Sequence, residues 1–413
     1  MKQGALADYF QGVGTKLLRG TEVDPNVSRG HELQGVSDFR VFLGSPLEKT
    51  KIPVTYVWIN DDMEEPISSA LTGTWYNSRR DQIGRDPEYR LYYPVASEEI
   101  VYRARAGDRL FLCQTNDSTL VAIFCPCGSS TEQQLLWLFG LKQNQNFEID
   151  QIDLRIERGR NLDIAARHVL ELIDIEVETN EEQLLEKLLK KFSGIFPTTA
   201  KFSDFTRQLS KEADPIADPD AALINWMDLE ERLFKTLERH IVGERIKLGF
   251  FSGGKPDVDD FVKFSLGVQN RRKSRAGWAF GNHVEAILQA NNLEYCREAT
   301  TEKRNGPDFL FPNQKAYHDQ SQPSSALVML AIKTSCKDRW RQVLAEADRI
   351  ERKHLLTLEP GISSTQTDEM KRAKLQLVIP LSLHSSFHPA QLSEILSVSE
   401  FLNLVRSKSK KAA

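Results

Sequence analysis

The stretch "LVMLAIKTSCKDRWRQVLAEADRI", from Leu327 to Ile350, decides how the second half of the chain folds. It begins with an apolar run, so we expect residues 326–332 to form a strand that is buried on both faces and central in a sheet. Lys333 follows where this strand emerges. Its long stem can lie on apolar surface while the ammonium group reaches a cleft.

The residues after this strand have the spacing of an amphipathic helix that packs on the sheet. Its apolar side chains fall within one stripe of the helical period, namely Trp340, Val343, Leu344, Ala347 and Ile350. Arg339 and Glu346 lie two turns apart on the same edge of that stripe. We therefore expect both to flank the packed face of the helix near Lys333.

Upstream, "GPDFLFP" places Asp308 at the start of another short strand. An acid before a strand, a lysine at a strand end and an acid beyond it together suit a magnesium-dependent nuclease. Carboxylates hold Mg²⁺, which polarises a phosphate and lowers the pKa of a bound water. A nearby lysine orients the nucleophile and offsets the developing charge. Spacing alone nevertheless favours a loop aspartate, a lysine lying along the surface and a solvated glutamate, because this pattern recurs by chance.

Length and composition indicate an ordinary globular protein with two domains. The chain has 413 residues, of which 27% are charged and 40% hydrophobic, and a formal net charge of −4. It is no polycation, although binding to nucleic acid depends on local basic patches rather than on the sum. We expect a first domain at 1–176, a linker helix at 177–194 and a second domain at 195–413.

The first domain is predicted to be rich in strands and the second to alternate strands with helices. "IPVTYVWI", "EYRLYYPV", "DRLFLC" and "STLVAIFCP" are short, rich in β-branched and aromatic residues, and separated by turn signals, followed by a helix at "STEQQLLWLFGL". This spacing favours a barrel or sandwich. In the second domain, "DPDAALINWMDLEERLFKTLERHIVGERI" predicts a long helix that begins at Asp-Pro. The basic segment "NRRKSRAG" precedes a further predicted helix, and strands at "HLLTL" and "LQLVIP" follow later.

The cysteines and the hydropathy pattern indicate a cytoplasmic protein. Five cysteines are scattered without a zinc-site spacing, so we expect reduced thiols: Cys113, Cys125, Cys127, Cys296 and Cys336. The first ten residues lack the apolar core of a signal peptide. No apolar run reaches the length of a membrane span, and we expect no membrane partner.

Four segments in order, "NRRKSRAG", "PDFLFP", "AYHD" and "KTSCKDRWRQVLAEAD", resemble the catalytic domain of EcoRII-like type II restriction endonucleases. The likeness is strongest from about 268 to 365 and weaker over the rest of the chain. It implies a C-terminal α/β restriction-endonuclease-like domain with a mixed sheet flanked by helices. It also implies an N-terminal β-rich, B3-like DNA-binding pseudobarrel.

The resemblance implies roles for the residues of the nuclease pattern. Asp308 and Glu346 would hold Mg²⁺, and Lys333 would stand beside the nucleophilic water. Tyr317 and Arg272 match positions that the family places near this site. The family also carries a glutamate where this chain has Gly281, which puts a second metal or an ancillary role in doubt. Glu285 lies one turn further along the same helix face and could substitute.

The resemblance also implies which residues contact DNA. Lys337, Asp338 and Arg339 match the family's base-reading cluster, which suits G·C pairs because Arg and Lys donate to guanine and Asp accepts from cytosine. The implied site is CC…GG with a central pair. Phosphate contacts are expected from the basic segment, namely Arg271, Lys273 and Arg275 with Arg272. Read without the family, a solvated first turn and a charged loop without a partner remain open.

In the N-terminal half, "SRGHEL" and "WYNSRRDQIGRDPEYR" resemble the DNA arms of B3-like domains. The expected contacts are His31, Arg79, Arg80, Arg85 and Arg90. A solvated basic hairpin is the alternative. By family analogy this domain would bind another copy of the target and control the catalytic domain.

These observations predict a homodimeric, Mg²⁺-dependent, sequence-specific DNA endonuclease, since a palindromic duplex needs one active site per strand. A companion DNA methyltransferase is an expected partner in function that is not physically required. Two alternatives remain: a DNA-binding regulator with a decayed site, suggested by Gly281, and an endonuclease of the same fold that requires methylcytosine. A scaffolding protein has little support because nothing repeats.

Overall fold

The computed structural model describes residues 6, 9–35, 39–63, 65–141, 162, 164–173, 175, 182–210, 213–302, 306–336 and 339–412. The chain divides into two compact units, Met1–Glu178 with Pro360–Thr365 and Thr179–Glu359 with Gln366–Ala413. Among the described residues, no helix combines the length and the apolar character that a membrane span requires.

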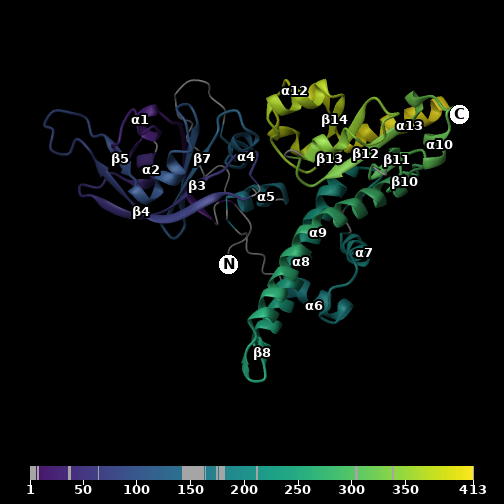
Figure 1. Ribbon diagram of the computed structural model, residues 1–413, viewed down its shortest axis with the longest axis horizontal. Helices are drawn as coiled ribbons and strands as arrows, with labels where there is room; N and C mark the ends of the chain where they lie inside the picture. Colours follow the sequence, from purple (N-terminus) through teal and green to yellow (C-terminus); the bar gives the residue numbers. More distant parts are fainter. Residues whose placement is uncertain are drawn as a thin grey trace. The chain divides into compact units, whose positions relative to one another are not determined.

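The described part of the first unit is built around one seven-stranded sheet (Figure 1). The strands are β1 (Phe10–Leu17), β2 (Glu32–Gln34), β3 (Thr50–Trp58), β4 (Ile67–Asn77), β5 (Tyr89–Tyr92), β6 (Arg109–Thr115) and β7 (Leu120–Cys125). Their order is β1-β6-β7-β3-β4-β5-β2, and only the β3–β7 pair is parallel. The helices are α1 (Gly20–Val23), α2 (Phe39–Leu43), α3 (Glu98–Val101), α4 (Ser130–Leu138) and α5 (Ile164–Leu172).

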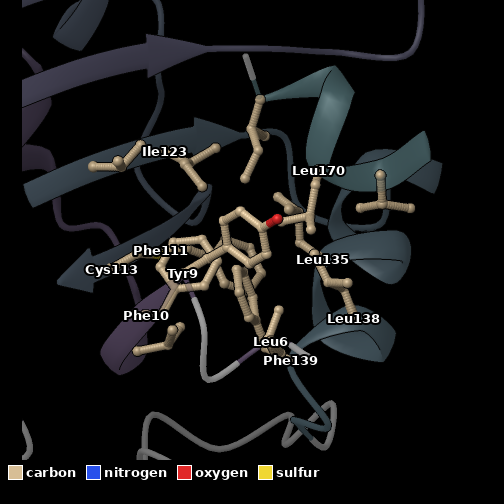
Figure 2. Packing of buried hydrophobic residues seen from close by; sticks show 14 of the residues in the cluster. Leu6, Tyr9, Phe10, Phe111, Cys113, Ile123, Leu135, Leu138, Phe139 and Leu170 are labelled. Atoms are coloured by element: carbon tan, nitrogen blue, oxygen red, sulfur yellow. The ribbon is translucent and has the colours of Figure 1, made fainter. Parts of the chain in front are cut away.

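Both faces of the sheet are buried at β6 and β7, where successive side chains point to opposite faces. In β6, Phe111 and Cys113 join the cluster that includes side chains of α4 and α5, shown in Figure 2. Leu110 and Leu112 join a second cluster with Trp75 on the other face. This two-sided burial explains why β7 and the middle of β6, from Leu110 to Cys113, are apolar. The strands predicted at β3, β5, β6 and β7 and the helix predicted at α4 are confirmed, whereas the B3-like pseudobarrel stays a prediction.

The second unit carries a mixed sheet with helices around it. Its helices are α6 (Glu182–Phe192), α7 (Thr199–Leu209), α8 (Pro219–Leu248), α9 (Val258–Ala290), α10 (Gln314–His318), α11 (Trp340–Val343), α12 (Ser364–Arg372) and α13 (Val398–Ala412). Its strands are β8 (Phe251–Ser252), β9 (Lys255–Pro256), β10 (Cys296–Arg297), β11 (Phe309–Phe311), β12 (Val328–Lys333), β13 (Lys353–Thr357), β14 (Leu375–Val378) and β15 (Ile395–Leu396).

The main sheet of this unit has the strand order β10-β11-β12-β13-β14-β15. The β10–β11 and β11–β12 pairs are antiparallel, and the pairs from β12 to β15 are parallel. The predicted α/β unit with a mixed sheet is confirmed. The strand β12 lies in the interior of the sheet, is buried from Val328 to Ala331 and ends at Lys333; it begins two residues later than predicted, because Ser324–Ala326 form a 3₁₀ turn.

Two long helices, α8 and α9, lie side by side and are joined by the β8–β9 hairpin (Figure 1). The predicted start of α8 is confirmed, since the Asp218 side chain accepts a hydrogen bond from the Ala221 backbone N–H over 2.9 Å. The expectation that "NRRKSRAG" precedes a helix is wrong. These residues lie inside α9, where Arg272 and Arg275 pair with glutamates of α8.

The helix predicted after Lys333 is also shorter than expected. It ends at Val343, and the residues beyond it form turns. Ala347 has a φ of 50°, a left-handed conformation that no helix continues through. Trp340, Val343, Ala347 and Ile350 are nevertheless buried, so the apolar spacing found the packed residues but not their backbone conformation.

Candidate active site

Asp308 and Lys333 are brought together by the antiparallel pairing of β11 with β12. The register pairs Phe309 with Leu330, so Asp308, one residue before β11, lies beside the end of β12. The Asp308 Oδ2 accepts a hydrogen bond from the Ile332 backbone N–H over 2.7 Å. The Lys333 Nζ lies 3.8 Å from the same oxygen. Burial raises the pKa of Asp308, while the Ile332 hydrogen bond and the Lys333 charge oppose this shift.

Glu346 is the third member of the cluster and lies in the turn that follows α11. Burial raises its pKa to about 7; the Lys333 charge opposes the shift, and the charge of Asp308 adds to it. Its Oε2 is buried and accepts no hydrogen bond from the described part of the chain. An unpaired, desolvated carboxylate oxygen that also feels the charge of a second carboxylate is costly unless a cation or a proton neutralises it.

Three hydrogen bonds to other segments stabilise the turn that carries Glu346. The Asp348 backbone N–H donates to the Glu302 carboxylate over 3.1 Å, and the Arg349 backbone N–H donates to the Tyr317 hydroxyl over 3.2 Å. The Lys353 ammonium, on β13, donates to the Ala347 carbonyl over 3.0 Å. These contacts hold Glu346 in place without a continuous helix.

Tyr317, one of the expected site residues, acts on this turn. Its hydroxyl lies 2.7 Å and 2.6 Å from the two oxygens of the Glu302 carboxylate, and burial raises its pKa. It forms no hydrogen bond with Asp308, Lys333 or Glu346 in the described residues. Tyr317 is therefore a positioning residue for the Glu346 turn.

Arg297, on β10, is a residue of this site that the sequence analysis missed. Its positive charge is among those that oppose the raised pKa of Asp308. The Arg297 Nη1 donates to the Glu285 carboxylate over 2.5 Å and to the Asn282 side chain over 3.2 Å. A Cβ placed at Gly281 would lie 2.8 Å from the Arg297 Nη2. The guanidinium thus occupies space that the absence of a side chain at 281 leaves open.

Glu285 and Arg272, both expected near the site, have other partners. Glu285 binds Arg297 and accepts a hydrogen bond from the Tyr295 hydroxyl over 3.0 Å, so it reaches the cluster only through Arg297. The Arg272 Nε donates to the Glu238 carboxylate over 2.6 Å. In the described residues Arg272 forms no hydrogen bond or ion pair with the three clustered residues.

The basic residues expected to contact DNA fall into distinct environments. Arg275 is buried, 2.9 Å from the Glu230 carboxylate, and its guanidinium lies over the rings of Phe202 and Phe234. Arg271 is exposed and lies over the Phe196 ring. Lys273 and Arg339 are exposed. Lys337 and Asp338 lie outside the described residues.

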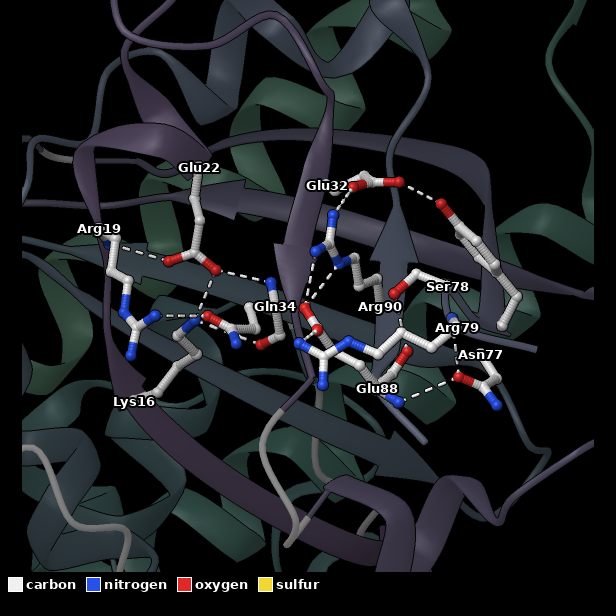
Figure 3. A network of polar contacts seen from close by, with 11 residues as sticks. Lys16, Arg19, Glu22, Glu32, Gln34, Asn77, Ser78, Arg79, Glu88 and Arg90 are labelled. Carbon is white, nitrogen blue, oxygen red and sulfur yellow. Dashed lines mark hydrogen bonds and ion pairs between the residues drawn. The ribbon is translucent and has the colours of Figure 1, made fainter. Parts of the chain in front are cut away.

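In the first unit, four of the five expected DNA contacts are paired with carboxylates, and two of them, Arg79 and Arg90, belong to one network (Figure 3). Arg90 binds both Glu32 and Glu88, and Arg79 binds Glu88. The His31 Nε2 lies 2.8 Å from the Glu98 carboxylate. Arg80 pairs at the surface with Glu48 and Asp81. Arg85 is exposed and forms no side-chain ion pair within the described residues.

The cluster fits a hard divalent cation with few protein ligands. Among the described residues, no group of three or more His, Cys, Asp or Glu side chains could hold a metal. Asp308 and Glu346 nevertheless offer two carboxylates, one with an unpaired buried oxygen. This donor set suits Mg²⁺, which is commonly held by one or two carboxylates and keeps several waters.

Comparison with known proteins matches the second unit. Residues 234–402 match the family described as "EcoRII C terminal". The type II restriction enzyme EcoRII of Escherichia coli is 41% identical over 186 residues, which span 45% of this chain and 45% of that enzyme. The predicted resemblance to EcoRII-like type II restriction endonucleases is thereby confirmed for this part of the chain.

Two solved structures are also similar. Metal-depleted Ecl18kI in complex with uncleaved DNA aligns with a TM-score of 0.43 and 17% identity, covering 55% of this chain and 84% of that one. The same enzyme with uncleaved, modified DNA aligns with a TM-score of 0.41 and 15% identity, covering 57% and 86%.

Proposed function

We propose that the C-terminal part of the chain is an EcoRII-like endonuclease domain and that the protein is a magnesium-dependent, site-specific type II endonuclease acting on double-stranded DNA. The observation that carries the proposal is the convergence of Asp308, Lys333 and Glu346 from three elements. The buried Oε2 of Glu346 accepts no hydrogen bond in the described residues, so a bound cation would stabilise the charge of this cluster.

Each clustered side chain has a role in phosphodiester hydrolysis. Asp308 and Glu346 would hold Mg²⁺, which when bound polarises the scissile phosphate and lowers the pKa of a coordinated water. Lys333 orients the attacking water and offsets charge that develops on the phosphate. Arg297 adds a fixed positive charge next to Asp308. Its Nη2 forms no hydrogen bond within the described residues, and we propose that it donates to a phosphate oxygen.

Recognition is proposed to use Lys337, Asp338 and Arg339 at a CC…GG site with a central pair. Guanine presents acceptors and cytosine a donor in the major groove, which these side chains complement. Arg271 and Arg339 are exposed and unpaired with carboxylates in the described residues, which suits contacts to phosphates or bases. Arg275 is buried in an ion pair, so we assign it to the stability of α9 instead.

We propose a homodimer, since a twofold-symmetric site needs one active site per strand. A companion methyltransferase would protect the host DNA, and the setting would be the cytoplasm of a bacterium or archaeon. The first unit, proposed to be B3-like, would bind a further DNA copy and regulate cleavage. Arg85 is the expected contact there that lacks an ion-pair partner in the described residues.

The experiment is a plasmid digestion with Mg²⁺ or EDTA, on methylated and unmethylated DNA, comparing wild type with Lys333→Ala. Discrete fragments that need both Mg²⁺ and Lys333 are expected, and their ends map the site. Lys374→Ala is the matched control, because this exposed lysine forms only a surface ion pair with Glu351. Fragments that persist in Lys333→Ala would refute the assignment of this cluster.

A second candidate function, a DNA-binding regulator without cleavage, draws on Gly281 and the guanidinium beside it. It predicts specific binding that needs no metal and no cleavage of either plasmid. Cleavage lost in Lys333→Ala with binding intact eliminates it. Cutting confined to methylated plasmid would instead identify an endonuclease that requires methylcytosine.

A further inference from the structure

The helix α9 exposes a continuous stripe of side chains that nothing in the described residues covers. The stripe has alternating spacings of three and four residues and consists of Asp259, Val262, Leu266, Gln269, Lys273 and Ala276, all exposed. Leu266 is 58% exposed and Val262 46% exposed. This spacing places the six side chains on one face of the helix, as at the a and d positions of paired helices, with Val262, Leu266 and Ala276 as its apolar members.

The stripe faces away from α8, so its own neighbour does not cover it. The opposite face of α9 makes the contacts with α8, through Asp260 with Arg245, Arg272 with Glu238 and Arg275 with Glu230. Val258 is also exposed, at 66%, and lies one turn before Val262, so it extends the apolar surface toward the N-terminal end of α9. Contiguous exposed apolar surface of this kind marks an interaction site.

The charges at the two ends of the stripe are opposite. Asp259 stands at its N-terminal end and Lys273 toward its C-terminal end, seven residues on either side of Leu266. Neither forms an ion pair within the described residues. If the stripe of a second copy packs antiparallel with Leu266 on the twofold axis, Asp259 of each copy faces Lys273 of the other. A surface that complements itself about a twofold axis is what an isologous dimer requires.

We propose that α9 is the interface between two copies of this chain, paired as an antiparallel two-helix seam centred on Leu266. The two Leu266 side chains and the flanking Val262 side chains form the apolar middle, and two Asp259–Lys273 ion pairs close the ends. The seam fixes the register, because a shift by one heptad would separate the opposite charges. Lys273 then belongs to the dimer rather than to a DNA phosphate. The inference rests on the homodimer proposed above and is independent of cleavage.

The test is the self-association of the full-length chain without DNA and with EDTA, measured by sedimentation velocity over a concentration series. Wild type is expected to dimerise. Asp259→Lys and Lys273→Asp each place like charges at both ends of the seam and should raise the dissociation constant about tenfold or more. The double variant Asp259→Lys/Lys273→Asp restores opposite charges and should recover most of the wild-type affinity.

A cross-linking pair tests the direction of the two helices. Leu266→Cys puts a thiol from each copy at the axis and should give a covalent dimer on mild oxidation, judged against wild type with its exposed Cys127. Ala276→Cys is the matched control, because its antiparallel mate would lie about 30 Å away at ~1.5 Å per residue. Efficient cross-linking through residue 276 would indicate parallel helices and overturn the proposal.

Other outcomes also decide the matter. A monomeric wild type overturns both the homodimer and this interface, while plasmid nicking still reports on the proposed nuclease. A dimeric wild type that neither charge variant weakens, or a double variant that stays dissociated, overturns the interface alone. If Lys273→Asp lowers only the affinity for DNA, Lys273 contacts phosphate and the proposed seam is wrong.

Discussion

Gly281 determines which charge lies beside Asp308. With no side chain at 281, the Arg297 guanidinium approaches α9 and is held there by Glu285 and Asn282. Its fixed positive charge offsets the carboxylate of Asp308. Nothing in "EYCREAT" indicates that Arg297 is a site residue, because its role depends on the absence of a side chain at Gly281, in the helix that precedes this segment.

We predict that Gly281→Ala and Arg297→Ala impair the same step. The added Cβ would lie 2.8 Å from the Arg297 Nη2 and displace the guanidinium. Loss of one fixed donor to a phosphate oxygen should lower single-turnover cleavage about a hundredfold. The double variant should cleave no more slowly than Arg297→Ala alone, because the glycine change acts through Arg297.

Gly277→Ala on the same helix is the matched control. A Cβ there meets nothing within 4 Å, so the change should leave cleavage intact and stabilise the helix by about 1 kcal/mol. Additive losses in Gly281→Ala and Arg297→Ala would contradict the proposed link between the two residues.

Glu346 links metal binding to the pH dependence of stability. Its pKa is raised from 4.5 to about 7 in the folded protein. Between these values the unfolded chain has released the proton while the folded protein still holds it, so folding loses stability as pH rises through this window. Glu346→Gln stays neutral and should therefore raise the melting temperature in EDTA at pH 8 more than at pH 5.

The response to Mg²⁺ shows whether the higher melting temperature of Glu346→Gln comes from the lost charge or from better packing of the glutamine side chain. At pH 8 the metal should raise the melting temperature of wild type, since a ligand that binds only the folded state stabilises it. It should have little effect on Glu346→Gln. Glu351→Gln is the control, because this exposed glutamate pairs with Lys374 and its pKa is lowered. An equal gain for Glu346→Gln at both pH values would show that Glu346 titrates normally.

At the scale of elements, α9 is held to the unit by buried charge. Glu230, Arg275 and His283 are each buried, and the His283 Nε2 lies 2.9 Å from the Glu230 carboxylate. Burial lowers the pKa of His283, so the arginine supplies the positive charge that Glu230 requires. Removing one partner of a buried pair leaves the other uncompensated.

Arg275→Ala should therefore destabilise the protein by about 3–5 kcal/mol in urea unfolding. It should not change the salt dependence of DNA binding, which would fall if Arg275 contacted a phosphate. Lys247→Ala removes an exposed pair with Glu244 on α8 and should cost less than about 1 kcal/mol. If Arg275→Ala instead weakens the salt dependence of DNA binding and leaves stability unchanged, Arg275 contacts a DNA phosphate.

The elements differ in how well the sequence predicts them, for physical reasons. The strand β12 is apolar throughout and interior in the sheet, so its pattern and its Lys333 end were predictable. The turn carrying Glu346 was not, because Ala347 adopts its left-handed φ only with the support of Glu302, Tyr317 and Lys353. The continuity of α9 through its basic segment likewise depends on glutamates of α8.

At the scale of the whole molecule, the second unit was easier to predict than the first. Residues 234–402 match a family, and β11 and β12 lie in the recognisable segments "PDFLFP" and "LVMLAIK". The first unit was partly predicted: β1 and β4 are rich in Gly, Ser and Thr, and the pairing of β3 with β7 joins strands that are distant along the chain. Several of its arginines satisfy carboxylates within the unit, which a basic segment alone does not reveal.

Regulation by the first unit can be tested by deletion, and the structure determines where the deletion should end. The α6 helix contributes Leu188 to a core cluster with Phe202, Phe205 and Leu233. A deletion through residue 192 would therefore expose the core of the second unit, whereas one through residue 178 keeps α6. If the first unit inhibits, the shorter deletion should cleave single-site plasmid about tenfold faster than the full chain, as a lid or cover would predict.

The deletion through residue 192 is the matched comparison, because it differs only by α6 and its flanks. Burying Leu188 is worth about 1.5–3 kcal/mol, so its loss should lower stability without reporting on regulation. An unchanged cleavage rate in the shorter deletion would rule inhibition out. The first unit would then serve DNA binding alone. In that case Arg85→Ala should reduce the dependence of the DNA affinity on salt concentration by the equivalent of about one phosphate contact.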